Sequence, residues 1–149
     1  MHFYFAYGSN MNSERVVERG LEFTEVFSAT MNGVALRFNK RAIKDPKMVY
    51  ANVVYAPNSC VEGVVYRLSD AGQITKMDYF EGSPVRYSRE KFWLKKPDGS
   101  TLSAWVYIAN KAMLADGLKP ASWYLDHLLK GKQYLSKEYF DALAQTPTC

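Results

Sequence analysis

The sequence predicts one α+β domain, in which a mixed or antiparallel sheet curls toward a partly closed β-barrel with a few flanking helices. The chain has 149 residues, the size of one domain with a sizeable core. Hydrophobic residues make up 48% and aromatic residues 15%, and the eleven Tyr and eight Phe suit a β-rich interior. Strand-like segments outnumber helical ones, and no repeat, linker or low-complexity stretch divides them. We therefore treat residues 1–149 as one domain.

The first half of the chain is predicted to consist mostly of strands. The apolar run at the start is typical of a buried strand, and Gly8 then permits a tight turn. Gly63, inside a later strand, indicates a bulge or the close approach of another segment. The expected elements are a strand over residues 3–7, a helix over 13–19 between Asn12 or Ser13 and Gly20, strands over 25–30, 34–38, 48–55 and 61–68, a hairpin turn at Asn32-Gly33, a surface loop over 39–47 and a turn at 57–59.

The second half is predicted to combine a helix, a hairpin and two C-terminal helices. Ile74 and Met77 are spaced by about one helical turn from each other and from Phe80 or Glu81, so these residues share one face of the first helix. The expected elements are a helix from the N-cap Ser69 to Gly82, strands over 86–96 and 101–109 joined by a turn at 97–100, a helix over 120–129 that begins at Pro120, and a helix from Ser136 through Leu143.

Charge and composition exclude several classes of function. The formal net charge is +4, but the basic residues are scattered and form no compact stripe, so we expect no nucleic-acid partner. The densest groups, Lys40-Arg41 with Lys44 and Lys95-Lys96 with Lys91, lie beside expected turns and are interpreted as solvated edges. Mild positive charge suits a small anionic substrate.

The two cysteines and the hydropathy pattern indicate a cytoplasmic protein. Cys60 precedes a strand and Cys149 is the last residue, an arrangement that suits a reducing compartment better than a disulfide. Strand-forming residues begin almost at Met1, which leaves no room for a signal peptide. No apolar run approaches the ~20 residues of a membrane helix, so we expect no membrane association.

The turn Gly8-Ser9-Asn10 is the first candidate site. A strand-to-helix turn of this kind leaves backbone N–H groups pointing in one direction, which makes a small nest for a carboxylate or an oxyanion. The alternative is an ordinary turn without a ligand. A nucleophilic Ser9 would need His2 or His127 as its base, and these two histidines have no metal-ligand spacing to each other or to the cysteines. We therefore expect neither a bound metal nor a cofactor.

Glu81 is the second candidate, at the end of the amphipathic helix. Its predicted position faces a pocket rim beside Tyr79 and Phe80, and apolar surroundings tune a carboxyl group for proton transfer near neutral pH. The alternative is a helix-end acid that is solvated or paired with Arg86. Asp78 is a competing carboxylate, but it is expected to point away from the face that carries Ile74 and Met77.

Four motifs and a C-terminal segment together resemble the γ-glutamylcyclotransferases. The residues Phe5-Ala6-Tyr7-Gly8-Ser9-Asn10-Met11 resemble that family's YGSN signature. The similarity continues through Gly63-Val64-Val65-Tyr66, Asp78-Tyr79-Phe80-Glu81-Gly82 and Trp105-Val106-Tyr107, and a C-terminal segment from Pro120 to Tyr139 resembles the family's closing helices. Each motif is weak alone, but their order and spacing span nearly the whole chain, which makes the combined signal specific.

The resemblance implies a small mixed β-barrel with a pocket at its open end, acting as a monomer or homodimer. It implies that Tyr7, Gly8, Ser9 and Asn10 bind a γ-glutamyl substrate, that Tyr107 belongs to the same pocket, and that Glu81 is the catalytic acid and base. The expected product is 5-oxoproline, formed without a cofactor. The segment of residues 82–87 resembles enzymes that act on γ-glutamylamines, whereas the YGSN loop resembles those that act on γ-glutamyl amino acids, so the leaving group stays open. A hydrolase and a non-catalytic binding module are the alternatives.

Overall fold

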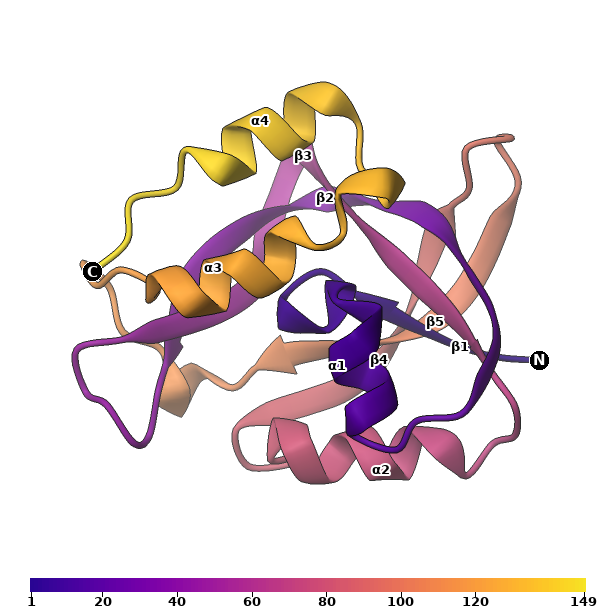
Figure 1. The fold of residues 1–149 in the computed structure, drawn as a ribbon, viewed down its shortest axis with the longest axis horizontal. Coiled ribbons are helices and arrows are strands. Elements are labelled where there is room, and N and C mark those ends of the chain that lie inside the picture. Colours follow the sequence, from indigo (N-terminus) through magenta and orange to yellow (C-terminus); the bar gives the residue numbers. More distant parts are fainter.

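The computed structural model describes residues 1–149 and shows a closed five-stranded barrel with helices packed outside it (Figure 1). The strands follow the order β1-β3-β2-β4-β5 around the barrel. Their bounds are β1 His2–Ala6, β2 Phe23–Arg41, β3 Val49–Leu68, β4 Tyr87–Lys95 and β5 Thr101–Ala109. The helices are α1 Ser13–Glu18, α2 Gln73–Glu81, α3 Ser122–Leu129 and α4 Lys137–Ala144, with short 3₁₀ turns at Ser9–Met11, Lys111–Met113 and Lys132–Tyr134. The predicted α+β class is confirmed.

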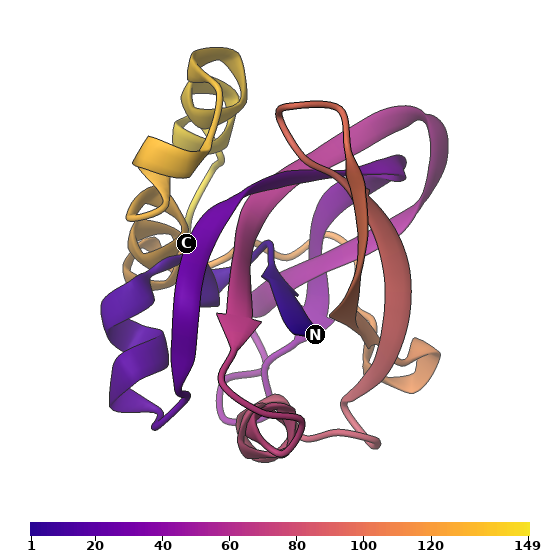
Figure 2. The same ribbon diagram turned by 90° about the vertical axis from the view of Figure 1, so that its right-hand side faces the viewer.

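The barrel closes through two unlike contacts. Strand β1 pairs antiparallel with β3 along its whole length and parallel with β5 at Tyr4 and Trp105. On the other side, β2 meets β4 at a single pair, Thr30 and Lys95. Figure 2 shows β2 and β3 bending around the barrel, with α2 lying across one end. The predicted barrel is therefore confirmed, and the sheet closes completely where only partial closure was predicted.

The predicted hairpin turn at Asn32-Gly33 is wrong, and so is the predicted turn at residues 57–59. Both segments lie inside long strands, β2 and β3, that pair antiparallel from end to end. Asn32 pairs with Cys60, and the next pair is Val34 with Tyr55. The single residue Gly33 therefore lies opposite the four β3 residues 56–59. Gly33 has φ +81°, a conformation that favours glycine. The turn-forming residues therefore make a bulge that bends two continuous strands.

The helix ends follow local capping chemistry, with two corrections. Asn12 caps α1 by accepting a hydrogen bond from the Glu14 N–H, and Ser136 caps α4 in the same way, as predicted. Helix α2 does not begin at Ser69: the Asp70 carboxylate accepts from the Gly72 N–H, and the helix starts one residue later. Helix α3 begins at Ser122, two residues after the predicted Pro120. No helix in the structure is long and apolar enough to cross a membrane.

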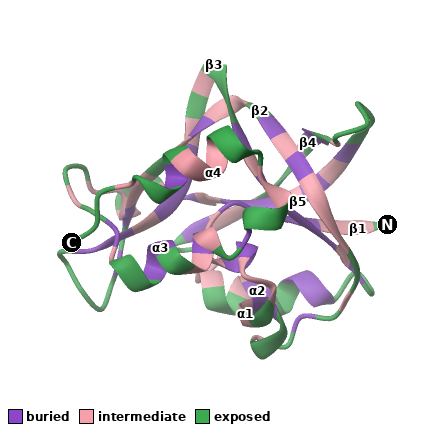
Figure 3. Cartoon of the chain, turned by 45° about the horizontal axis from the view of Figure 1, so that its top comes forward, coloured by how far each residue is buried: buried purple, intermediate pink, exposed green.

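One hydrophobic cluster of 29 buried residues fills the barrel and reaches under the helices. Figure 3 shows the buried positions concentrated on the strands and on the inner sides of the helices. Phe5 of β1 and Tyr66 of β3 are almost fully buried near its centre. Tyr66 donates a hydrogen bond to the Asn10 carbonyl at 2.6 Å, which ties the turn after β1 to the core. The core thereby fixes the position of the Gly8-Ser9-Asn10 turn.

At Gly63 strand β3 lies close against β1, which is one of the two possibilities that the sequence indicated. A Cβ atom at this position would lie 2.4 Å from the Ala6 carbonyl oxygen and 2.7 Å from the Phe5 ring. We expect Gly63→Ala to destabilise the protein by about 1–3 kcal/mol or more, because neither backbone nor a packed ring can yield cheaply. Thermal melts should show a Tm lower by about 3–10 °C. Gly72→Ala is the control, because its φ and ψ are helical and the added Cβ would meet only the exposed Asp70 carboxylate, at 3.2 Å. Equal melts for the two variants would contradict the packing argument.

Candidate active site

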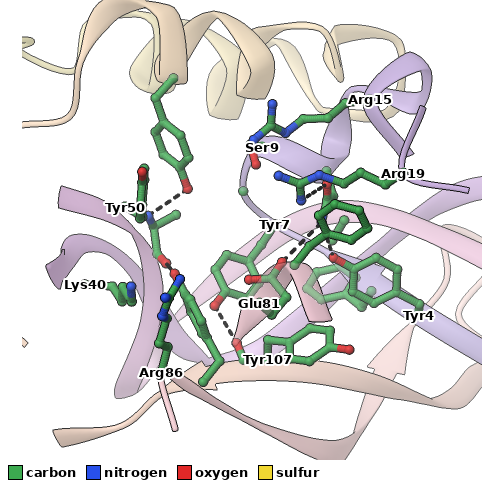
Figure 4. Close-up of a pocket in the computed structure, with 18 residues that line it drawn as sticks. Tyr4, Tyr7, Ser9, Arg15, Arg19, Lys40, Tyr50, Glu81, Arg86 and Tyr107 are labelled. Atoms are coloured by element: carbon green, nitrogen blue, oxygen red, sulfur yellow. Dashed lines mark hydrogen bonds between the residues drawn. The ribbon is translucent and has the colours of Figure 1, made fainter. Parts of the chain in front are cut away.

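The candidate active site is a pocket at the end of the barrel where β1 runs into the Gly8-Ser9-Asn10 turn (Figure 4). Its cavity volume is about 160 Å³, and the cavity opens to solvent. Every residue that the sequence singled out as catalytic or substrate-binding lines it. The lining residues are Tyr4, Phe5, Ala6, Tyr7, Gly8, Ser9, Asn10, Arg15, Arg19, Lys40, Tyr50, Ala51, Phe80, Glu81, Arg86, Tyr87, Tyr107 and Tyr124.

The turn after β1 forms one wall of the pocket and is packed tightly from behind. The Met11 N–H donates to the Gly8 carbonyl at 3.0 Å, and this bond closes the turn. The Gly8 N–H donates to no acceptor in the protein, so it is free for a ligand. A Cβ atom on Gly8 would lie 3.1 Å from the Tyr124 hydroxyl and 3.3 Å from the Ala51 Cβ. The turn is therefore fixed in place by close contact with α3 and β3.

The Asn10 side chain joins this turn to the Glu81 carboxylate. Its amide nitrogen donates to Glu81 Oε1 at 3.2 Å and to the Tyr4 hydroxyl at 2.9 Å. Its amide oxygen accepts a hydrogen bond from Arg19 at 3.1 Å. Asn10 is buried, so these bonds hold it in one orientation. The geometry thus gives Asn10 a positioning role toward Glu81, which the sequence did not predict.

Glu81 lies at the last position of α2, directly before Gly82 at φ +64°. Ile74 and Met77 on the same face are buried, as predicted, and they direct Glu81 into the pocket. Burial raises the pKa of Glu81 to about 6, although the positive charges of Arg19, Lys40 and Arg15 oppose the rise. The prediction that Tyr79 and Phe80 both provide apolar surroundings for Glu81 was wrong for Tyr79, which is 83% exposed and does not line the pocket.

Buried tyrosines form the rest of the pocket wall. Tyr7 donates its hydroxyl hydrogen bond to the Tyr107 carbonyl, and Tyr87 donates to the Ala51 carbonyl at 2.8 Å. The Tyr124 hydroxyl accepts from the Ala51 N–H at 2.9 Å. Burial raises the pKa of all four tyrosines, which keeps their hydroxyls protonated. The wall is therefore neutral and held by hydrogen bonds to the backbone.

Asp78, the competing carboxylate, is bound to side chains of β4 and β5 and does not enter the pocket. Its carboxylate accepts a hydrogen bond from the Tyr107 hydroxyl at 2.7 Å and pairs with Arg89 at 3.0 Å. Asp78 is absent from the pocket lining, so it supports the site from outside. Its two partners leave it engaged in fixing Tyr107, and Glu81 is the one carboxylate that lines the pocket.

Four cationic side chains line the pocket, and the sequence analysis predicted none of them as a pocket residue. Arg15 and Arg19 come from the α1 segment, Lys40 from β2, and Arg86 from the loop before β4. The salt bridges of the structure lie elsewhere, and none involves these four residues. The interpretation of Lys40 as part of a solvated edge was wrong, because it is 2% exposed. The pocket therefore carries an excess of positive charge around one carboxylate.

Ser9 has no base beside it. Its hydroxyl makes no hydrogen bond, whereas the His127 ring contacts the Asn12 amide at 3.0 Å and Arg15 at 3.3 Å. No cluster of three or more His, Cys, Asp or Glu side chains is placed to hold a metal ion. The geometry gives no support to a serine nucleophile.

Solved structures define the class of fold to which this barrel and pocket belong. One described as a gamma-glutamyl cyclotransferase matches with a TM-score of 0.85 and 21% identity, over 99% of this chain and 89% of that one. An uncharacterized human protein matches with a TM-score of 0.85 and 22% identity, over the same shares of each chain. A yeast gamma-glutamyl cyclotransferase specific to glutathione matches with a TM-score of 0.68 and 16% identity, over 95% and 93%. At these identities the likeness establishes a shared fold.

The family is shown by the sequence itself. Residues 4–126 match the family model described as "Gamma-glutamyl cyclotransferase, AIG2-like", and the chain belongs to that family. Comparison with curated proteins finds no significant match. The resemblance seen in the four sequence motifs is confirmed at the level of the family.

The raised pKa of Glu81 makes stability depend on pH. The folded protein holds the Glu81 proton more tightly than the unfolded chain, whose pKa is 4.5. The stabilisation of the folded state by this proton is fully present below pH 4.5 and is lost as the pH rises through about 6. The free energy of unfolding decreases by about 2 kcal/mol over this range. Urea unfolding between pH 4.5 and 8 should show Glu81→Gln gaining that amount relative to the wild type. Parallel stability profiles would contradict a raised pKa of Glu81 in the folded protein.

Proposed function

We propose that the protein is a γ-glutamylcyclotransferase that releases 5-oxoproline and a free amine or amino acid from a γ-glutamyl amide. One observation carries the proposal. Glu81, with a pKa of about 6, is held by Asn10 inside a pocket whose other charged groups are cations. Such a carboxylate accepts and returns protons near neutral pH, which is what an intramolecular aminolysis requires.

The reaction needs orientation and proton transfer more than it needs a strong nucleophile. The substrate's α-ammonium gives a proton to Glu81, and the resulting amine attacks the γ-carbonyl carbon to form the five-membered ring. The amide bond to the leaving nitrogen then breaks, and Glu81 returns a proton to that nitrogen. Glu81 then takes the second proton from the ring nitrogen and passes it to the released amine, so two protons leave the α-nitrogen, two reach the leaving nitrogen and charge is conserved. Attack within one molecule gains most from a pocket that fixes the folded conformation.

The remaining pocket groups have roles that follow from their chemistry. The free Gly8 N–H, together with the turn of Ser9 and Asn10, would stabilise the oxyanion or bind the α-carboxylate. Tyr7 and Tyr107 would shape the wall against the γ-glutamyl carbon chain. The Arg15 and Arg19 guanidiniums would attract carboxylate groups of the substrate. We propose the cytoplasm as the compartment, because both Cys60 and Cys149 are free and exposed.

The product distinguishes this reaction from its rivals. Purified protein incubated with a panel of γ-glutamyl compounds should release 5-oxoproline, detected by mass spectrometry in ¹⁸O-labelled water without incorporation of the label. Free glutamate carrying ¹⁸O would establish hydrolysis instead. Saturable binding without any product from the panel would indicate a binding module.

A further inference from the structure

Lys40 is a buried cation that lacks an anionic partner. It is 2% exposed on β2, and its ammonium lies 5.4 Å from the centre of the Tyr50 ring and 5.5 Å from that of Tyr87. It makes no side-chain hydrogen bond and no ion pair within the protein. Contact with two aromatic rings offsets only part of the cost of removing an ammonium from water. An anion from outside the protein would complete the site.

Arg86 faces the same part of the pocket. Its side chain packs over Gly82, where a Cβ atom would lie 2.5 Å from the Arg86 Cδ, so its stem is held beside the end of α2. Burial and the nearby charge of Arg86 lower the pKa of Lys40, whereas the charge of Glu81, which is not close enough for an ion pair, raises it. Figure 4 shows Lys40 and Arg86 on one side of Glu81, with Arg15 and Arg19 on the other.

The pocket therefore has two cationic ends separated by the candidate proton carrier. The α-carboxylate of a γ-glutamyl substrate accounts for one of them. The end formed by Arg15 and Arg19 adjoins the Gly8-Ser9-Asn10 turn, which suits that carboxylate. The end formed by Lys40 and Arg86 lies across Glu81 from that turn, so in the proposed binding mode it is left for the leaving group.

On the basis of the proposed function, we infer that Lys40 and Arg86 form a subsite for a carboxylate on the leaving group. The substrates are then γ-glutamyl amino acids or peptides, whose leaving amine carries a carboxylate, and γ-glutamylamines are poor substrates. Charge-assisted hydrogen bonds from an ammonium and a guanidinium to a carboxylate provide this selection. Arg86 belongs to the segment that resembles the γ-glutamylamine enzymes, so the structure assigns that segment to the opposite preference.

The test compares two substrates that differ by one carboxylate, γ-glutamylalanine and γ-glutamylethylamide. At pH 8, the wild type should prefer γ-glutamylalanine by about 100-fold in kcat/KM. Lys40→Met should reduce this ratio by about 10- to 100-fold, mainly through KM for the acid. The ratio cancels any effect of the substitution on Glu81 that both substrates share. Lys44→Met, at an exposed position in the adjoining loop, is the matched control and should leave the ratio unchanged.

A second variant and a binding measurement keep the test decisive. Arg86 is exposed, so Arg86→Gln should fold even if Lys40→Met does not, and it should also lower the ratio. Calorimetric Kd values on Glu81→Gln should favour γ-glutamylalanine over the ethylamide. If the variant shows this binding preference but the wild type turns over no γ-glutamyl compound, the proposed function is wrong and the carboxylate subsite is still supported. Turnover of both compounds with equal efficiency, or a ratio unchanged in both variants, would overturn the subsite alone.

Discussion

Replacing Glu81 with Gln is expected to lower kcat by about 10²–10⁴-fold while the protein remains folded. The glutamine side chain has the same size, and its carbonyl oxygen can still accept the hydrogen bond from the Asn10 amide. What it cannot do is accept a proton from the α-ammonium or return one to the leaving nitrogen. Rates of 5-oxoproline formation above pH 7, where wild-type Glu81 is ionised, measure the loss directly.

A conservative control separates this chemical loss from a general loss of charge. Glu90→Gln removes an exposed carboxylate on β4, outside the pocket, and should leave the rate within about twofold. A substrate analogue should bind Glu81→Gln with an affinity close to that of the wild type. A decrease in kcat of less than tenfold would remove Glu81 from the mechanism. Asp78, one helical turn from Ile74 and bonded to Tyr107, would then be the next carboxylate to test.

Local patterns predicted the elements of the fold but not how the long strands bend. The β1 run, the cap at Asn12 and the left-handed Gly82 each depend on neighbours in sequence, and each is found in the structure. The pair Asn32-Gly33 is equally suited to a hairpin turn and to a bulge, because both use glycine at positive φ. The choice between them is made by pairing with β3, whose partners lie up to 45 residues away, as in the pair Phe23 and Leu68. Such distant pairing leaves no local trace in the sequence.

The candidate site was predicted where its residues are contiguous and missed where they are dispersed. Glu81 and the turn after β1 stand in short motifs, so the sequence could single them out. Lys40 belongs to the basic cluster Lys40-Arg41 with Lys44, and it is the member that is buried. The sequence of the cluster does not show which of the three side chains points inward. Arg15 and Arg19 could have been found, because their spacing of four residues puts both on one face of the first helix. The pocket tyrosines resemble ordinary core residues until the barrel brings them together.

Gly8→Val is expected to lower kcat/KM by about 10²-fold, whereas Ser9→Ala should keep most of the activity. Contact decides the result at Gly8, since its φ of −113° is open to any residue. A Cβ atom would already stand 3.1 Å from the Tyr124 hydroxyl and 3.3 Å from Ala51, and the two methyl groups of valine add to the crowding. Tyr124 is fixed by its bond to the Ala51 N–H, so the turn must move instead. A shift of about an ångström there can cost ~10²-fold in rate.

Ser9 differs because its side chain makes no hydrogen bond in the structure, and its backbone N–H is retained whatever the side chain. Both variants are compared by kcat/KM on the best substrate, with thermal melts to separate misplacement of the turn from unfolding. Gly8→Ala should fall between the wild type and Gly8→Val, because it adds the first contact without the methyl groups. An inactive Ser9→Ala beside a nearly normal Gly8→Val would mean that the hydroxyl takes part in the chemistry. The backbone of the turn would then no longer explain substrate binding, and a nucleophilic serine would become the better hypothesis.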